Sequence, residues 1–123
     1  MIKLEDELVS LELAKEMKEL GFKQDSLWYW ATANSVNYWI NRGATGICDI
    51  PAYTVAELGE ILPYKLDYDC WLEIDKIKND KILWCVSYRV PECSASEISF
   101  KNAKEADARA KMLIYLKKQG WLL

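Results

Sequence analysis

The stretch that decides the fold is Glu105-Ala106-Asp107-Ala108-Arg109-Ala110-Lys111-Met112-Leu113-Ile114-Tyr115-Leu116. Its apolar residues recur with the spacing of a helix face, so it predicts a closing helix from about Ala103 to Gln119. Small alanines fill its first half and bulky residues its second half. This taper suits a helix that crosses a twisted sheet at close approach. We therefore expect a helix that packs, and not one that reacts.

The ends of this helix carry capping signals. Asn102 and Glu105 have the spacing of a capping box. Gly120 stands where a left-handed residue closes a helix. Two pairs have the i, i+4 spacing of ion pairs: Glu105 with Arg109, and Asp107 with Lys111.

Two shorter helices are predicted before it. The first is Leu11 to Leu20, with Ser10 as its N-cap and Gly21 after its last turn. Leu13, Met17 and Leu20 form its apolar side.

The second short helix is Val55 to Leu62. Thr54 and Glu57 form a capping box at its start, and Pro63 follows its end. Gly59 inside it costs about 1 kcal/mol relative to alanine, which suggests that another backbone passes close to it.

Short aromatic and β-branched runs predict two hairpins. Ser26–Thr32 and Val36–Arg42 form the first, although Ser35–Asn41 also fits a helix. The second joins Leu66–Lys76 to Ile82–Val90. Two further short strands are predicted at residues 47–50, ended by Pro51, and at residues 98–100, after a polar loop at 91–96.

These elements predict a single α+β domain over residues 1–123. We expect a two-layer fold, in which an antiparallel sheet of about four or five strands is covered on one face by the N- and C-terminal helices. The middle helix would lie at an edge of that sheet.

Composition argues against most enzyme classes. The 123 residues include no histidine, so the commonest acid/base near neutral pH and the usual zinc ligand are both missing. The net charge of −3 does not indicate a non-specific nucleic-acid binder. No phosphate-binding glycine motif is present. We expect no enzymatic activity, no cofactor and no metal.

The cysteines and the N-terminus indicate a cytoplasmic protein. The four cysteines are irregularly spaced, which argues against a zinc site; they are Cys48, Cys70, Cys85 and Cys93. Residues 1–7 are acidic and lack the apolar core of a signal peptide. No apolar run reaches the length that spans a bilayer. We therefore expect reduced thiols, with Cys70 and Cys85 in the core and Cys93 exposed but unreactive.

The densest aromatic cluster is the candidate interaction surface. It comprises Trp28, Tyr29, Trp30, Tyr38 and Trp39, with Arg42 beside them. Strand alternation puts Trp28 and Trp30 on one face and Tyr29 on the other. The cluster fits a core seam, which we favour, or an exposed surface that anchors a partner.

A row of carboxylates forms a second candidate. Asp67, Asp69, Glu73 and Asp75 alternate along one predicted strand face with Trp71. They fit a hard-cation site or an acid/base pair, but a solvated strand face explains them better.

Three strings resemble a group of short uncharacterised proteins encoded by bacteriophages and prophages. They are Tyr53-Thr54-Val55-Ala56-Glu57-Leu58-Gly59-Glu60-Ile61-Leu62-Pro63, the stretch 105–116, and the opening helix at 10–22. Together they cover roughly a third of the chain. The resemblance implies a small intracellular protein of phage type, and it assigns no site residues.

The leading functional hypothesis is a non-enzymatic accessory protein that binds another protein, or a second copy of itself, through the aromatic hairpin or an uncovered sheet face. The first alternative is a weak single-strand nucleic-acid binder that stacks bases on tryptophan and tyrosine. The second is an enzyme that uses carboxylates, with or without a metal.

Overall fold

The structure, a computed structural model, describes residues 3–46, 48–66, 70–78, 80–90 and 93–122, without the side chains of 90 and 93–97. Its helices are η1 (Leu4–Glu7, a 3₁₀ helix), α1 (Leu11–Glu19), α2 (Val55–Ile61) and α3 (Glu105–Lys118). Its strands are β1 (Trp28–Thr32), β2 (Tyr38–Arg42), β3 (Ile50–Pro51), β4 (Lys65–Leu66), β5 (Cys70–Lys78), β6 (Ile82–Val90) and β7 (Cys93–Asn102).

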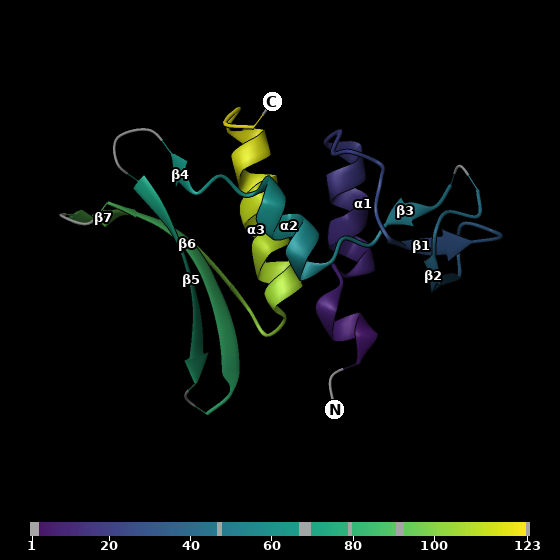
Figure 1. The fold of residues 1–123 in the computed structure, drawn as a ribbon, viewed down its shortest axis with the longest axis horizontal. Coiled ribbons are helices and arrows are strands. Elements are labelled where there is room, and N and C mark those ends of the chain that lie inside the picture. The colour runs from purple at the N-terminus through teal and green to yellow at the C-terminus, as the bar shows by residue number, and fades with distance from the viewer. Residues whose placement is uncertain (1–2, 47, 67–69, 79, 91–92, 123) are drawn as a thin grey trace.

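The strands form two antiparallel sheets, with the helices between them (Figure 1). The small sheet has the order β2-β1-β3, and the large sheet has the order β4-β5-β6-β7. The α+β class and both hairpins are confirmed, but the hairpins belong to separate sheets. Each hairpin packs one of its faces against the helical layer, and the two hairpins do so from opposite sides (Figure 1).

The closing helix packs on the large sheet as its sequence predicts. Val86 and Tyr88 of β6 are fully buried, and so are Ala106 and Ala110 of α3. The alanines let the helix backbone approach the strands closely. Helix α3 contacts β6 and β7, whereas α1 packs against α3 and β3. The sequence predicts that the first and last helices cover one sheet; in the structure α3 covers the large sheet directly, and α1 packs behind α3.

At the ends of α1 and α3, the predicted C-terminal glycines are confirmed, but the predicted capping of α1 by the Ser10 side chain is wrong. Gly21 and Gly120 have positive φ values of 85° and 78° after α1 and α3. The Ser10 side chain makes no cap hydrogen bond. Instead, the buried Asp107 carboxylate of α3 accepts the Ser10 backbone N–H at 2.8 Å. An anion at a helix N-terminus offsets the orphan amides and the helix dipole there.

The predicted capping box at the start of α3 does not form. Asn102 Oδ1 accepts the backbone N–H of Lys104 at 2.9 Å, and α3 begins one residue later, at Glu105. Glu105 pairs with Arg109 as predicted. The predicted partner of Asp107 is Lys111, but Asp107 lies 4.0 Å from Lys104 Nζ, its other oxygen binds the Ser10 N–H, and Lys111 contacts the Lys101 carbonyl.

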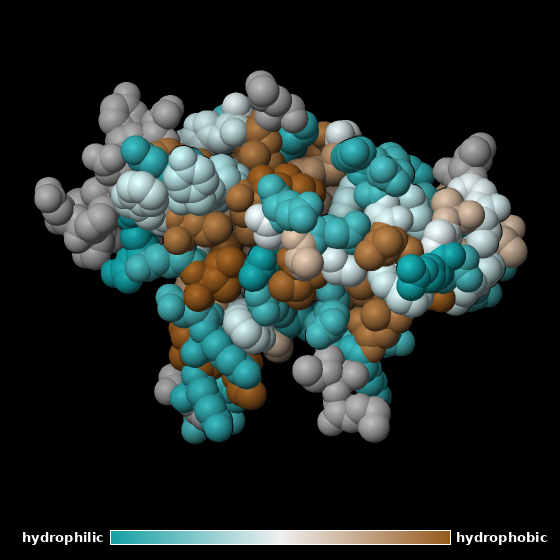
Figure 2. All heavy atoms as spheres, in the orientation of Figure 1, coloured by the Kyte–Doolittle hydropathy of each residue, from teal (hydrophilic) through white to brown (hydrophobic). Residues whose placement is uncertain are grey.

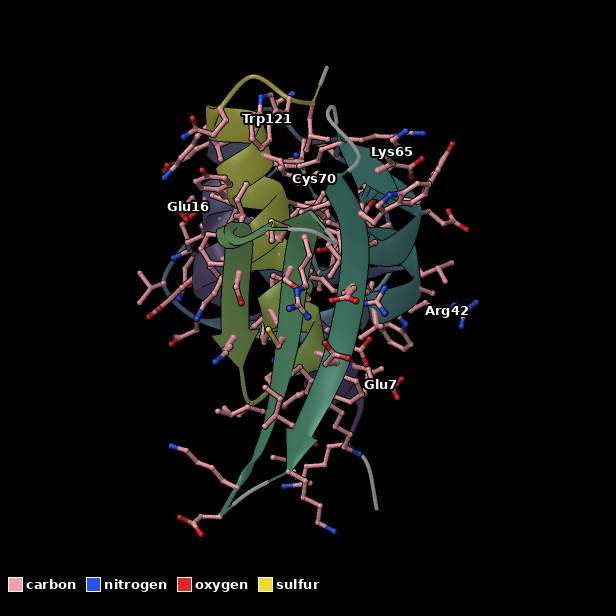
Figure 3. All side chains as sticks on the ribbon, turned by 90° about the vertical axis from the view of Figure 1, so that its left-hand side faces the viewer. Glu7, Glu16, Arg42, Lys65, Cys70 and Trp121 are labelled. Carbon is pink, nitrogen blue, oxygen red and sulfur yellow. The ribbon has the colours of Figure 1, made fainter. Side chains whose placement is uncertain are left out.

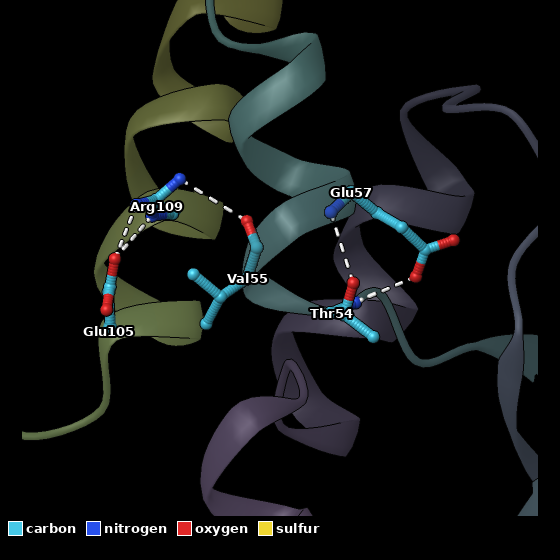
Figure 4. A network of polar contacts seen from close by, with 5 residues as sticks. All are labelled: Thr54, Val55, Glu57, Glu105 and Arg109. Carbon is cyan, nitrogen blue, oxygen red and sulfur yellow. Dashed lines mark hydrogen bonds and ion pairs between the residues drawn. The ribbon is translucent and has the colours of Figure 1, made fainter.

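The α2 capping box is confirmed (Figure 4). Thr54 Oγ1 accepts the Glu57 backbone N–H at 3.1 Å, and Glu57 Oε1 accepts that of Thr54 at 2.9 Å. The close neighbour of Gly59 is the Arg109 guanidinium and not a backbone. That guanidinium bridges Glu105 and the Val55 carbonyl, so it joins α3 to α2.

Several strand boundaries differ from the predictions. Strand β5 begins at Cys70, and β3 is limited to Ile50 and Pro51. Strand β7 begins at Cys93, so most of the predicted polar loop at 91–96 is strand.

Asp67 and Asp69 lie outside the described residues, as does the Cys93 side chain. Among the helices that the structure describes, none is long and apolar enough to cross a membrane.

Candidate functional site

The first hairpin has two faces, which its register defines. Trp28 pairs with Arg42, and Trp30 with Ile40, on one face. Ala31 pairs with Trp39 on the other face. Cross-strand partners point to the same side of a sheet. The six candidate residues are therefore divided between the two sides of one small sheet.

The first face lies against the core. Trp30 Nε1 donates a hydrogen bond to the Val9 carbonyl at 3.0 Å, which ties the sheet to the start of α1. The Lys15 ammonium of α1 lies 5.0 Å from the centre of the Tyr38 ring. Trp28 is half-buried beneath the Arg42 guanidinium, 5.9 Å from its ring centre. These side chains are partly or wholly engaged within the molecule.

The second face is buried over β1, where Ala31 is fully buried, and it meets solvent at Trp39 of β2. Tyr29 is buried there, and its hydroxyl donates to the Gln24 carbonyl at 3.3 Å and accepts the Ser26 N–H at 3.2 Å. Trp39 is 45% exposed, and Leu27, just before β1, is 56% exposed. Strand alternation places Leu27 on the same face as Tyr29. Of the six candidates, only Trp39 and Arg42 are classed as exposed.

Beside Leu27 lies a cleft that the sequence does not reveal. It has a volume of about 540 Å³ and separates α2 from the segment that precedes β1. We call it the α2 cleft; it is lined by Lys23, Asp25, Ser26, Leu27, Tyr53, Glu57, Glu60 and Ile61. Its two walls are about thirty residues apart in the chain, so no local pattern predicts it.

Hydrogen bonds hold the two walls together. Ser26 Oγ donates to Glu57 Oε1 at 2.9 Å, and the same carboxylate closes the capping box of α2. The Tyr53 hydroxyl donates to the Lys23 carbonyl. Burial raises the pKa of Tyr53 to about 12, with a further contribution from the charges of Glu57, Tyr29 and Asp25. The cleft is therefore fixed before any ligand arrives.

The α2 cleft is acidic with apolar patches. Asp25, Glu57 and Glu60 line it, against one cation, Lys23, which lies 3.9 Å from Asp25. Leu27 and Ile61 supply apolar surface beside these carboxylates. This arrangement suits a ligand group that combines a positive charge with an apolar part.

Of the carboxylate row, the structure describes Glu73 and Asp75, and these two do not gather into a site. Glu73 and Asp75 are exposed on the outer face of the large sheet, and Glu73 pairs with Arg89 at 3.2 Å. No cluster of three or more potential metal ligands exists within the described residues. Trp71 shares this face, is 43% exposed and lies 6.1 Å from the Tyr64 ring.

Asp49 is a structural residue that sequence patterns missed. Its buried carboxylate accepts hydrogen bonds from the backbone and hydroxyl of Thr45 and from the amides of Gly46 and Thr32. Burial alone would raise the pKa of Asp49, but these bonds outweigh burial and lower it. The glycine-containing loop before β3 is therefore tied to β1.

The surface lacks one broad apolar area on the face that Figure 2 displays. Apolar side chains reach the surface there in small areas between hydrophilic ones.

Comparison with known proteins gives no match to a protein-family model, a curated protein or a solved structure. The resemblance to phage proteins therefore stays a prediction. The functional proposal rests on the α2 cleft and on the exposed residues Leu27 and Trp39.

Proposed function

We propose that this chain is a non-enzymatic accessory protein, of phage type as its sequence predicts, that binds another protein. The binding surface comprises Trp39, Leu27 and the α2 cleft. The partner supplies a segment with apolar side chains and at least one lysine or arginine. The observation that carries this proposal is the preformed acidic cleft lined by the exposed Leu27, which shares a hairpin face with the exposed Trp39.

Charge and shape support such a partner. A basic side chain in the cleft would meet Asp25, Glu57 and Glu60, and its methylenes would lie along Leu27 and Ile61. Trp39 offers a large, partly exposed ring, and tryptophan is enriched among residues that dominate binding energy. The cleft walls already hold each other, so binding would lose little conformational entropy.

The nucleic-acid alternative fits this surface less well. A phosphate near the hairpin would approach Arg42 and Lys23, but it would also approach the three cleft carboxylates. Non-specific binding to a nucleic acid requires several phosphate contacts and falls steeply with salt. Trp28 and Trp30, which stacking would need, are at least half-buried.

The test is an affinity purification from bacterial lysate, with and without nuclease. The bait is the wild-type chain beside Trp39→Ser, Glu60→Lys and Trp71→Ser. Trp71 is a matched control, because it is as exposed as Trp39 but lies on the large sheet. We expect one protein to be recovered with the wild type in both samples, and to be lost with the Trp39 and Glu60 variants only.

Other results would contradict the proposal in distinct ways. Loss with Trp71→Ser alone would move the interface to the outer face of the large sheet. Recovery that disappears with nuclease would favour the nucleic-acid alternative. Equal recovery with all four baits would remove the assigned surface.

A further inference from the structure

Strand β7 is an edge of the large sheet. It runs for ten residues, Cys93–Asn102, and pairs with β6 on one side. No described strand pairs with its other side. In Figure 3, which faces the large sheet, β7 is the strand at the left margin, and the labelled Glu16 lies on that side. Such an edge presents backbone donors and acceptors to any chain that can lie alongside.

The outward-facing backbone groups of this edge can be assigned. Leu72 of β5 donates its N–H to the Tyr64 carbonyl, away from β6, so its partner Tyr88 turns its N–H and C=O toward Ile98 of β7. Lys101, three residues after Ile98, therefore faces outward, and its carbonyl accepts Lys111 Nζ at 3.5 Å. In an antiparallel pair the N–H and C=O of one residue point to the same side, and the sides alternate along the strand. Ser99, two residues earlier, therefore turns its N–H and C=O outward as well.

A groove adjoins this edge. It has a volume of about 230 Å³ and is lined by Leu13, Glu16, Phe100, Lys111, Ile114, Tyr115 and Lys118. Phe100 lies on the inner face of the sheet, and its ring centre is 5.5 Å from that of Tyr115. The groove therefore has an apolar floor built from β7, α3 and α1. A strand added to β7 would direct every second side chain toward this floor.

The rim of the groove is positive. Lys111 and Lys118 line it, and Lys101 is exposed on the edge strand itself. Among the lining residues that the structure describes, Glu16 is the one carboxylate, and it already pairs with Lys118 at 3.2 Å. The binding partner recorded for Lys111 within the described residues is a backbone carbonyl, not a carboxylate. Acidic side chains on an incoming strand would thus be favoured.

We propose that the β7 edge and its groove bind an extended segment of a partner protein as a fifth strand of the large sheet. The segment alternates acidic and apolar side chains. Its backbone pairs with Ser99 and Lys101, its apolar side chains contact Phe100 and Tyr115, and its acidic side chains, on the opposite face of the sheet, meet the Lys101 side chain. Backbone pairing supplies affinity and the groove supplies specificity, as in other cases of strand addition.

A second copy of the chain fits this edge less well. A two-fold pairing of β7 that sets Lys101 opposite its copy would bring the edge lysines of both copies together. Like charges placed across neighbouring strands are destabilising. This site shares no lining residue with the α2 cleft, so it is independent of the function proposed above.

The probes are two synthetic peptides with blocked ends. One is Glu-Leu-Glu-Val-Thr-Ile-Glu, and the other has lysine in place of each glutamate. Each is titrated into the ¹⁵N-labelled full chain, and chemical shifts and amide exchange are followed. We expect saturable shifts at the amides of residues 98–102, slowed exchange at Ser99 and Lys101, and at least tenfold weaker binding of the lysine peptide.

Variants separate strand addition from simple charge attraction. Ser99→Pro removes an outward N–H while leaving the pairing to β6, and proline is tolerated at such edge positions. We expect this variant to lose peptide binding and Ser99→Ala to retain it. If Ser99→Pro fails to fold, Lys101→Glu replaces it, and we expect that variant to reverse the preference between the two peptides.

Three results would overturn the proposal. The first is no shift at residues 98–102 with millimolar acidic peptide. The second is equal binding of both peptides. The third is sedimentation of the free chain as a dimer whose association is abolished by Ser99→Pro, which would assign the edge to a second copy.

Discussion

At the scale of single residues, Asp49 has the clearest energetic consequence. Its lowered pKa means that the folded state favours the carboxylate. The resulting stabilisation is complete above the unfolded pKa of about 3.9, and it is lost as pH falls through the folded value. We expect Asp49→Asn to lower the free energy of unfolding by about 2 kcal/mol at pH 7, because charged acceptors give the stronger hydrogen bonds.

Urea unfolding of both proteins at pH 7 and pH 2.5 checks this. The deficit of Asp49→Asn should shrink at the lower pH, where the wild-type carboxyl is protonated in the unfolded chain. Asp75→Asn is the control, since Asp75 is an exposed aspartate on the large sheet. A deficit of the same size at both pH values would contradict the assigned role of the charge.

Tyr53 gives the opposite pH dependence. Its pKa is raised to about 12, so the folded state favours the neutral phenol. The stabilisation is complete below the unfolded pKa of about 10 and is lost as pH rises from there through 12. We expect the wild type to lose stability between pH 9 and pH 11 more steeply than Tyr53→Phe. Urea midpoints across this range measure it, and parallel curves for the two proteins would contradict it.

Residue-scale predictions succeed where the partner is close in the chain. The Thr54–Glu57 box and the Glu105–Arg109 pair depend on spacing within one helix, and both form. Asp107 reaches across to cap α1, a contact between residues 97 positions apart. No local pattern contains that information, so sequence reasoning assigned the cap to Ser10.

At the scale of elements, the contact between α2 and α3 depends on Gly59. A Cβ there would overlap the Arg109 guanidinium, which is held by Glu105 and the Val55 carbonyl. Alanine in a helix is favoured over glycine by about 1 kcal/mol. We expect Gly59→Ala to give none of this gain in the wild type, but to give it when Arg109→Ala is also present.

A double-mutant cycle of thermal or urea unfolding measures this coupling. The two single variants and the double variant are compared with the wild type. Additive effects would show that the guanidinium moves aside without cost, and would contradict the inferred crowding.

The alanine half of α3 provides a second test at this scale. Ala110 is completely buried where the helix packs into the core. We expect Ala110→Leu to overpack this contact and to lower the free energy of unfolding by about 1–3 kcal/mol. Ala56→Leu on α2 is the control, because Ala56 is exposed and its change should stay within about 0.5 kcal/mol. Equal melting temperatures for the Ala110 variant and the wild type would refute close packing.

Sequence patterns predict the elements better than they predict which elements pair or pack with one another. Periodicity and end signals located α1, α2, α3 and both hairpins, although α3 is buried over most of its surface and not on one face alone. They did not show that the hairpins lie in different sheets, since either edge of a hairpin offers the same backbone groups. The α2 cleft was missed for a related reason: it exists only where α2 and the segment before β1 come together.

At the scale of the whole molecule, both sheets share one interior. A single cluster of buried residues includes Ile50 from the small sheet and Val86 from the large sheet, with Met17 and Leu113 of the helices between them. Neither hairpin is expected to be stable alone, since isolated two-stranded sheets are marginal in water. The sequence predicts a single domain, and if that prediction holds, the whole chain should unfold cooperatively.

The six tryptophans allow a direct test of this cooperativity. Trp28, Trp30 and Trp39 report on the small sheet, and Trp71 and Trp84 report on the large sheet. With 5-fluorotryptophan incorporated, each ring gives a ¹⁹F resonance whose intensity follows urea unfolding. Because one core stabilises both sheets, we expect all native resonances to disappear with one midpoint. Separate midpoints for the two groups would instead show that the sheets unfold independently.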